Sequence, residues 1–202
     1  YIRRILEENK SPKIAELPPF TGGLVGYFSY DFISYSEPKL KLDAFDEESF
    51  NDIDLMLFDK IIAIDNLKNI IYLIINVKRE NFELNYKKAT MELNSLKSLL
   101  EEECEIEKEE KGKLLSSFTP LFNKEEFCQM VEKAKNYIYE GDIFQVVLSN
   151  RLVAPFEGTL KGAYNYLRKT NPSPYMFYFV SDNIELTGAS PETLVKLENN
   201  KL

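Results

Sequence analysis

Hydrophobic and polar positions change their period along the chain, and this change predicts where strands give way to helices. Two β-rich runs, 53–64 and 69–77, lie on either side of Asp65-Asn66-Leu67-Lys68, a sequence typical of a hairpin turn. Residues 70–75 are almost continuously apolar, so we expect both faces of this strand to be buried. From Asn81 to Leu100 apolar residues recur three or four positions apart, which predicts one long helix.

Shorter signals lie around these elements. Residues 1–10 predict a helix that ends before Ser11-Pro12, and residues 24–30 predict a strand interrupted by Gly26. A glycine inside a strand marks a bulge or a close approach of another backbone. The mixed charge run 101–113 predicts an exposed linker between two domains, which we place at 1–115 and 116–202.

The second half begins with a helix whose two ends are both signalled. Asn123 followed by Glu126 is typical of a capped helix start, and Gly141 is typical of a helix end. A strand is expected at 143–152, with the alternate face that begins at Phe144 in the core. The remaining expected elements are a helix at 159–168, strands at 175–180 and 184–187 around an Asp182-Asn183 turn, and a further hairpin that begins at 194–197 and turns at Asn199-Asn200.

Strands therefore outnumber helices, and short turns join them. Short connections of this kind favour antiparallel pairing, since parallel strands need long crossovers. We predict an α+β fold with largely antiparallel sheets packed with helices.

Composition narrows the classes of function. The net charge of −8 opposes binding to a phosphate backbone, so no nucleic-acid partner is expected. The chain holds no His, which excludes His-dependent triads and His metal ligands within it. No apolar run approaches the ~20 residues of a membrane span. Cys104 and Cys128 belong to no paired metal motif, and we expect free thiols in a cytoplasmic protein.

The most specific sequence motifs are three segments of the second half: 141–150 (GDIFQVVLSN), 171–178 (NPSPYMFY) and 188–192 (GASPE). In this order they resemble the large (synthase) subunits of anthranilate synthases, a family of chorismate-utilising enzymes. Residues 21–31 (TGGLVGYFSYD) resemble the N-terminal domain of the same family. The resemblance implies that 1–115 is this N-terminal domain, incomplete at its start. It also implies that 116–202 is the beginning of a chorismate-binding catalytic domain, truncated at its C-terminal end.

Gln145 is the first candidate catalytic residue. Taken alone, a Gln among apolar neighbours is better explained as a structural residue bonded to backbone. The resemblance changes this weighting, because family members that use water typically have a Lys base at this position and the amine-transferring members typically have Gln. A Lys can take a proton from water, whereas a Gln can only orient a nucleophile. The resemblance thus implies that Gln145 favours ammonia over water.

Glu192 is the second candidate catalytic residue. On sequence alone it is a surface Glu in a turn after Pro191. By resemblance it matches the carboxylic acid that helps the ring hydroxyl of chorismate to leave. Such an acid must keep its proton near neutrality, which requires a closed and largely dry site.

Pro174, Tyr175 and Met176 are the candidate inhibitor-binding residues. Two prolines in 171–178 predict a rigid turn that leads into an aromatic core strand, and this structural explanation stays open. The resemblance implies that these three residues line a pocket for tryptophan, the end product and feedback inhibitor. An indole needs a flat and polarisable slot, which Pro, Tyr and Met can provide. The family's other tryptophan-contacting motif, a Leu-Leu-Glu-Ser stretch, is not found in this chain.

The implied reaction is the amination of chorismate by ammonia with loss of the ring hydroxyl, followed by elimination of pyruvate to give anthranilate. Ammonia would come from a glutaminase subunit (component II), and Mg²⁺ would be held by ligands expected beyond residue 202. Two other functions stay open: the synthase subunit of aminodeoxychorismate synthase, against which Pro174-Tyr175-Met176 argues, and a non-catalytic scaffold or inhibitor-binding fragment.

Overall fold

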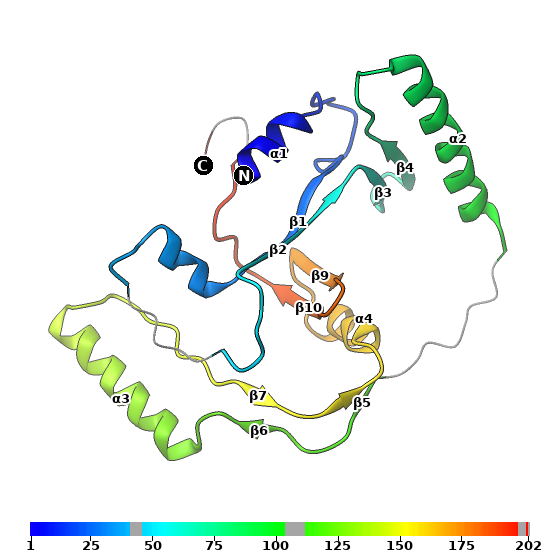
Figure 1. Ribbon diagram of the computed structural model, residues 1–202. Coiled ribbons are helices and arrows are strands. Elements are labelled where there is room, and N and C mark those ends of the chain that lie inside the picture. Colours follow the sequence, from blue (N-terminus) through cyan, green and yellow to red (C-terminus); the bar gives the residue numbers. More distant parts are fainter. Residues whose placement is uncertain (41–45, 104–111, 198–200, 202) are drawn as a thin grey trace. The chain divides into compact units, whose positions relative to one another are not determined.

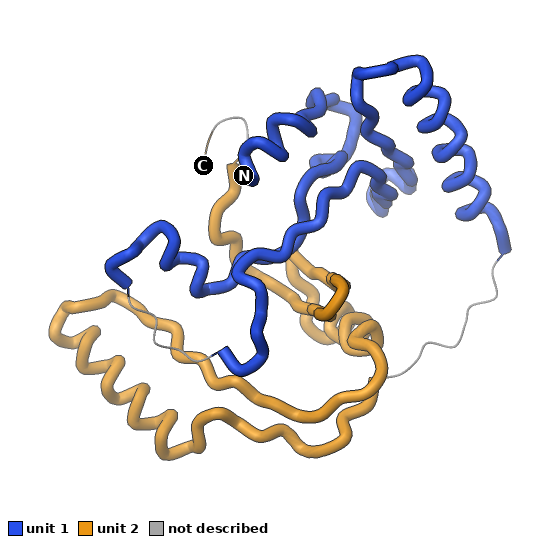
Figure 2. The backbone as a smooth tube through the Cα atoms, viewed as in Figure 1, with its two compact units in different colours: residues 1–105 blue, residues 106–202 orange. Residues whose placement is uncertain are grey.

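The computed structural model describes residues 1–40, 46–103, 112–197 and 201, which form two compact units (Figures 1 and 2). Unit 1 is residues 1–105 and unit 2 is residues 106–202. Much of the expected linker, Cys104 and the Asn199-Asn200 turn lie outside the described residues. The family domains assigned to 1–115 and 116–202 stay a prediction.

The described residues of unit 1 form two α-helices, a 3₁₀ helix and two antiparallel strand pairs, β1 with β2 and β3 with β4 (Figure 1). Its elements are α1 (Ile2–Glu8), β1 (Gly23–Phe28), the 3₁₀ helix η1 (Tyr30–Tyr35), β2 (Ile53–Phe58), β3 (Lys60–Asp65), β4 (Ile70–Ile75) and α2 (Phe82–Glu101). These elements match those expected from the hydrophobic pattern, apart from η1 and a break at Asp59 that divides the first β-rich run into β2 and β3.

Gly26 is explained by a close approach between β1 and β2. The two strands pair residue for residue, with Gly26 opposite Leu55, so there is no bulge. A Cβ atom on Gly26 would lie 1.9 Å from the carbonyl oxygen of Asp54, a separation that no side chain tolerates. The second of the two explanations for a glycine in a strand is therefore correct.

The expectation that both faces of residues 70–75 are buried is wrong. Ile70 and Ile71, on opposite faces, are 42% and 53% exposed, and residues 72–75 are half-buried. Ile71 stands opposite Ile64, which is also exposed. Helix α2 contacts β4 and holds Ala89, which at 9% exposure is the one buried apolar residue in the described part of the chain. Both faces of β4 thus combine an exposed residue with half-buried ones, and neither face is fully buried.

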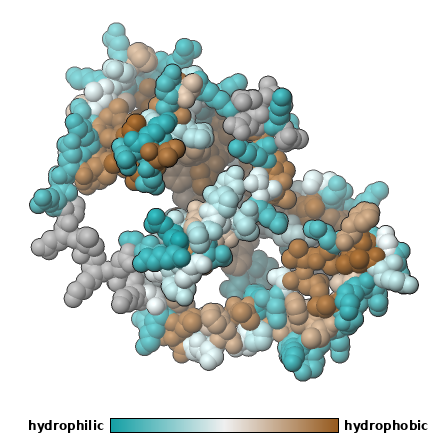
Figure 3. Space-filling view, turned by 180° about the vertical axis from the view of Figure 1, so that it is seen from behind, coloured by the Kyte–Doolittle hydropathy of each residue, from teal (hydrophilic) through white to brown (hydrophobic). Residues whose placement is uncertain are grey.

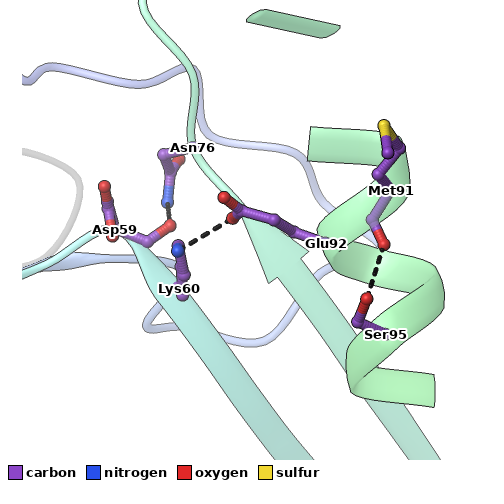
Figure 4. Close-up of polar contacts among 6 residues, drawn as sticks. All are labelled: Asp59, Lys60, Asn76, Met91, Glu92 and Ser95. Atoms are coloured by element: carbon purple, nitrogen blue, oxygen red, sulfur yellow. Dashed lines mark hydrogen bonds and ion pairs between the residues drawn. The ribbon is translucent and has the colours of Figure 1, made fainter. Parts of the chain in front are cut away.

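Asn76 and Lys60 make polar contacts close to the ends of β2, β3 and β4 (Figure 4). The side chain of Asn76 donates to the carbonyl oxygens of Thr21, at 2.6 Å, and Asp59, at 3.2 Å. Lys60 Nζ lies 2.8 Å from Glu92 Oε2 and so ties β3 to α2. Both partners are about half exposed, so this ion pair orients the helix and contributes little to stability.

In unit 2 the described residues form two helices and three antiparallel strand pairs: β5 with β8, β6 with β7, and β9 with β10. Its elements are β5 (Lys113–Leu114), β6 (Thr119–Pro120), α3 (Lys124–Glu140), β7 (Leu152–Val153), β8 (Phe156–Glu157), α4 (Lys161–Thr170), β9 (Tyr175–Val180) and β10 (Glu185–Ser190). Every strand pair described in either unit is antiparallel, and the α+β fold class is confirmed.

Both predicted ends of α3 are confirmed. The Asn123 side chain accepts from the Glu126 backbone N–H at 3.0 Å, and the Glu126 carboxylate accepts from the Asn123 N–H at 2.9 Å. Gly141 closes the helix in the left-handed conformation, with φ at 84°.

The strand expected at 143–152 is wrong, apart from its last residue. Within the described residues no strand pairs with 143–149, and only Leu152–Val153 forms β7. Phe144, expected in the core, is fully exposed. An extended segment becomes a strand only where a neighbour supplies hydrogen-bond partners, and the alternating pattern does not reveal that neighbour. The hairpin expected to begin at 194–197 likewise forms no strand over those residues.

Apolar side chains lie at the surface of both units, and Figure 3 shows the brown areas that they form on one face. Among the described helices none combines the length and the apolar character needed to span a membrane.

Candidate functional site

The β9–β10 hairpin brings two of the three specific segments side by side. Tyr175 stands opposite Ser190, and Met176 stands opposite Ala189. Pro174 directly precedes β9, and Glu192 follows β10 by two residues. The candidate inhibitor-binding residues and the candidate acid therefore lie at the same end of one hairpin.

This end of the hairpin is open to solvent. Pro174 and Glu192 are exposed, Tyr175 is 48% exposed, and Met176 is half-buried. The Ser173 hydroxyl donates to the Tyr175 carbonyl at 2.9 Å and stiffens the loop in front of β9. The described residues around Glu192 do not form the dry enclosure that a proton donor needs, so its catalytic role stays a prediction.

A shared carboxylate joins helix α4 to the same hairpin. Glu185 Oε1 accepts from the backbone N–H of Leu160 at 2.9 Å, at the start of α4, and also from the hydroxyl of Tyr178. A carboxylate at this position is favourable because the first N–H groups of a helix carry partial positive charge. One side chain of β10 thus holds both the helix start and the middle of β9.

Tyr178 is the centre of this group. The hydrogen bond to the Glu185 carboxylate raises the pKa of the Tyr178 phenol above its usual value, and partial desolvation adds to the increase. The ring of Tyr164 on α4 lies against the ring of Tyr178, with centroids 5.9 Å apart. The Arg168 guanidinium lies 5.7 Å from the Tyr164 ring centroid, on the same helix. Aromatic contacts therefore join α4 to β9 in addition to the hydrogen bonds.

No strand pairing among the described residues connects Gln145 to the β9–β10 hairpin. It is exposed, and its segment begins to pair with the rest of the unit only at Asn150. There the Asn150 side chain accepts from the Phe122 N–H at 3.0 Å and donates to the Phe122 carbonyl at 2.9 Å. The role of Gln145 stays a prediction from the family motif.

Two shallow surface pockets are described, and neither is lined by a predicted site residue. One, of about 370 Å³, lies along β6 and β7 and includes Arg151. The other, of about 340 Å³, lies in unit 1 between Pro18-Pro19 and the β3–β4 turn. Among the described residues no three His, Cys, Asp or Glu side chains are grouped so that they could hold a metal ion. The Mg²⁺ ligands expected beyond residue 202 stay a prediction.

The hydrogen bond between Tyr178 and Glu185 was not predicted from the sequence, although the spacing of the two residues across the turn indicates it. A two-residue turn at Asp182-Asn183 places Tyr178 opposite Thr187, as observed. Glu185 lies two residues before Thr187 and so is a diagonal neighbour of Tyr178 on the same face. A Tyr and a Glu seven positions apart across such a turn are within contact distance.

Comparison with known proteins identifies the family. A model described as chorismate binding enzyme matches residues 2–202. Anthranilate synthase component 1 of Acinetobacter calcoaceticus is 39% identical over 98% of this chain and 41% of its own length. The Aquifex aeolicus protein of the same name is 39% identical over 92% of this chain and 38% of its own.

A solved structure gives the same result. The crystal structure of anthranilate synthase component I from Streptococcus pneumoniae TIGR4 superposes with a TM-score of 0.76 at 31% identity, over 98% of this chain and 45% of that chain. The chain thus spans less than half the length of these relatives. The resemblance seen in the three sequence segments is confirmed, and the protein belongs to the chorismate binding enzyme family.

Proposed function

We propose that this chain is part of an anthranilate synthase component I that converts chorismate and ammonia to anthranilate and pyruvate in tryptophan biosynthesis. The observation that carries the proposal is the identity of 39% to proteins of that name across nearly the whole chain. Residues 1–115 would be the N-terminal domain and 116–202 the beginning of the catalytic domain. A glutaminase subunit would supply the ammonia, and Mg²⁺ would be bound by ligands outside this chain. The cytoplasmic location stays a prediction from the cysteine usage.

In this proposal Gln145 orients ammonia and Glu192 assists the leaving group. The nitrogen lone pair forms a bond to the chorismate ring, the bond from the ring to its hydroxyl breaks, and the Glu192 proton leaves with that hydroxyl as water. An uncharged amide suits this step because ammonia already has a usable lone pair and needs no strong base. Elimination of pyruvate then gives the aromatic product.

We further propose that tryptophan binds at the open end of the β9–β10 hairpin, against Pro174, Tyr175 and Met176. The exposure of Tyr175 and the partial exposure of Met176 leave apolar and aromatic surface available for an indole ring. The pairing of this strand end with the end of β10 supports a link between inhibitor binding and Glu192, since both follow from one hairpin.

Product analysis tests the function. The whole protein, meaning this chain at the length of its relatives, should convert chorismate, ammonia and Mg²⁺ to fluorescent anthranilate and pyruvate. Accumulation of aminodeoxychorismate without pyruvate release would instead identify the related synthase of that product.

The isolated chain provides a second test. Gln145 and Glu192 are both exposed, so we propose that the 202 residues alone do not form a working chorismate site. Calorimetry of this chain with tryptophan, and separately with chorismate and Mg²⁺, should show no tight binding. Micromolar chorismate affinity would contradict this view, whereas tryptophan binding alone would identify an inhibitor-binding fragment.

A further inference from the structure

The loop that precedes the proposed tryptophan residues is short and stiff. Only residues 171–174 separate the end of α4 at Thr170 from the start of β9 at Tyr175. Two of these four residues are prolines, whose φ angles are fixed near −65°. The Asn171 N–H donates to the Leu167 carbonyl at 2.8 Å, so the loop also begins on the helix. Because this loop is short and rigid, a displacement of α4 should also displace Tyr175 and Met176.

The position of α4 on the hairpin depends in turn on a small polar group. The helix contacts both β9 and β10. At its start, the Glu185 carboxylate binds the Leu160 N–H at 2.9 Å and the Tyr178 hydroxyl. Tyr178 and Glu185 are both partly buried, where the lost hydrogen bonds are less easily replaced by water.

We propose that Tyr178 and Glu185 are positioning residues for tryptophan sensitivity. By holding α4 against the β9–β10 hairpin, they set the conformation in which residues 174–176 meet the inhibitor. Neither residue needs to touch tryptophan or chorismate for this effect. The inference rests on the proposed tryptophan pocket and adds the element that controls its shape.

The experiment uses conservative variants of the whole protein in the presence of its glutaminase subunit. Tyr178→Phe removes one hydroxyl and keeps the ring contact with Tyr164, and Glu185→Gln keeps the shape of the side chain without its charge. The measurements are the tryptophan concentration at half inhibition, kcat, the KM for chorismate, and thermal unfolding. Each variant should raise the half-inhibitory concentration by about three- to tenfold, with kcat and KM within about twofold of the parent.

Three further variants make the result specific. Tyr166→Phe removes a hydroxyl from the exposed side of α4, and Glu157→Gln neutralises an exposed carboxylate on β8. Both should leave inhibition unchanged. The double variant Tyr178→Phe/Glu185→Gln should shift inhibition by less than the two single changes combined, because both act on the hydrogen bond between Tyr178 and Glu185.

The outcomes separate this inference from the pocket on which it rests. If Met176→Ala relieves inhibition while Tyr178→Phe and Glu185→Gln lower only the unfolding temperature, the pair is merely structural and the inference is overturned. If Met176→Ala leaves inhibition unchanged, the pocket assignment itself fails, and the inference fails with it.

Discussion

Tyr175 and Ser190 stand opposite each other at the ends of β9 and β10. This pairing joins the segment that carries the proposed inhibitor contacts to the segment that leads to Glu192. The two strands are hydrogen-bonded in antiparallel register, so a backbone shift at the start of β9 also displaces the end of β10. The proposed inhibitor contacts and the proposed acid can therefore both be tested by substitutions at one end of this hairpin.

Met176→Ala should relieve tryptophan inhibition of the whole protein by about tenfold or more, while chorismate turnover stays within a few-fold. The substitution removes a long, polarisable side chain from the proposed indole contact, and apolar contacts of this kind are worth about one to three kcal/mol. Inhibition curves with and without the change provide the measurement. Met91→Ala, at an exposed position of α2, is the matched control and should have no effect. Unchanged inhibition in Met176→Ala would remove this residue from the pocket.

Gln145→Lys should depress the rate of anthranilate formation with free ammonia, by about tenfold or more. The new side chain carries a positive charge, and when deprotonated it acts as a base for water rather than as a neutral guide for ammonia. Anthranilate fluorescence with ammonium salts measures the effect independently of the glutaminase subunit. Gln129→Lys on the exposed side of α3 provides the same chemical change away from the motif. An unaltered rate in Gln145→Lys would show that Gln145 is only structural.

Gly26→Ala should destabilise the protein by about 2 kcal/mol or more, since its methyl group would meet the Asp54 carbonyl at 1.9 Å and the strands would have to separate. Urea unfolding measures the loss. Gly162→Ala is the matched comparison, because a Cβ at Gly162 on α4 meets no other atom within 4 Å. That change should be neutral or stabilise by up to about 1 kcal/mol through helix propensity. Equal effects of the two substitutions would contradict the close approach at β1 and β2.

Asp65 should contribute stability that is lost in acid. Its carboxylate accepts from the backbone N–H groups of Lys68 and Leu67, each at 3.0 Å, and these bonds lower the pKa of Asp65 below 3.8. A depressed pKa in the folded state means that the contribution is present above the unfolded pKa, near 4, and disappears as pH falls through the folded value. The stability of Asp65→Asn should therefore fall less steeply than that of the parent between about pH 5 and pH 2.

The measurement for Asp65 is chemical unfolding at a series of pH values. Asp182→Asn, in the turn of the other hairpin, is the comparison for a general loss of negative charge. Parallel pH profiles for Asp65→Asn and the parent would show that the turn does not depend on the ionised carboxylate.

Features encoded by neighbouring residues could be predicted from the sequence. The capping pair Asn123 and Glu126 interact within one helical turn, so their spacing alone indicated where α3 begins. The β3–β4 turn was equally local, since Asp65 bonds the backbone two and three residues later. The family motifs likewise identified the chorismate binding enzymes correctly.

Features that depend on distant neighbours could not be predicted in the same way. Residues 143–152 alternate as a strand should, but their partner is not specified by the alternation, and Phe144 is exposed rather than buried. The predicted burial of Ile71 was wrong for a related reason. An apolar side chain in the sequence does not show whether another element of the fold covers it. The same limit applies to the candidate site. The arrangement of the hairpin end could be predicted from its local turn, whereas the surroundings of Gln145 depend on distant residues and could not be predicted.

Residues 143–149, which belong to no strand, have a consequence for chemistry as well as for packing. An unpaired run of backbone amides and carbonyls is a template onto which another strand can be laid. Side chains alternate strictly, so a slip of one residue in that pairing would turn Gln145 to the opposite face. If another strand paired with this stretch, the register of that pairing would therefore determine the face on which Gln145 lies.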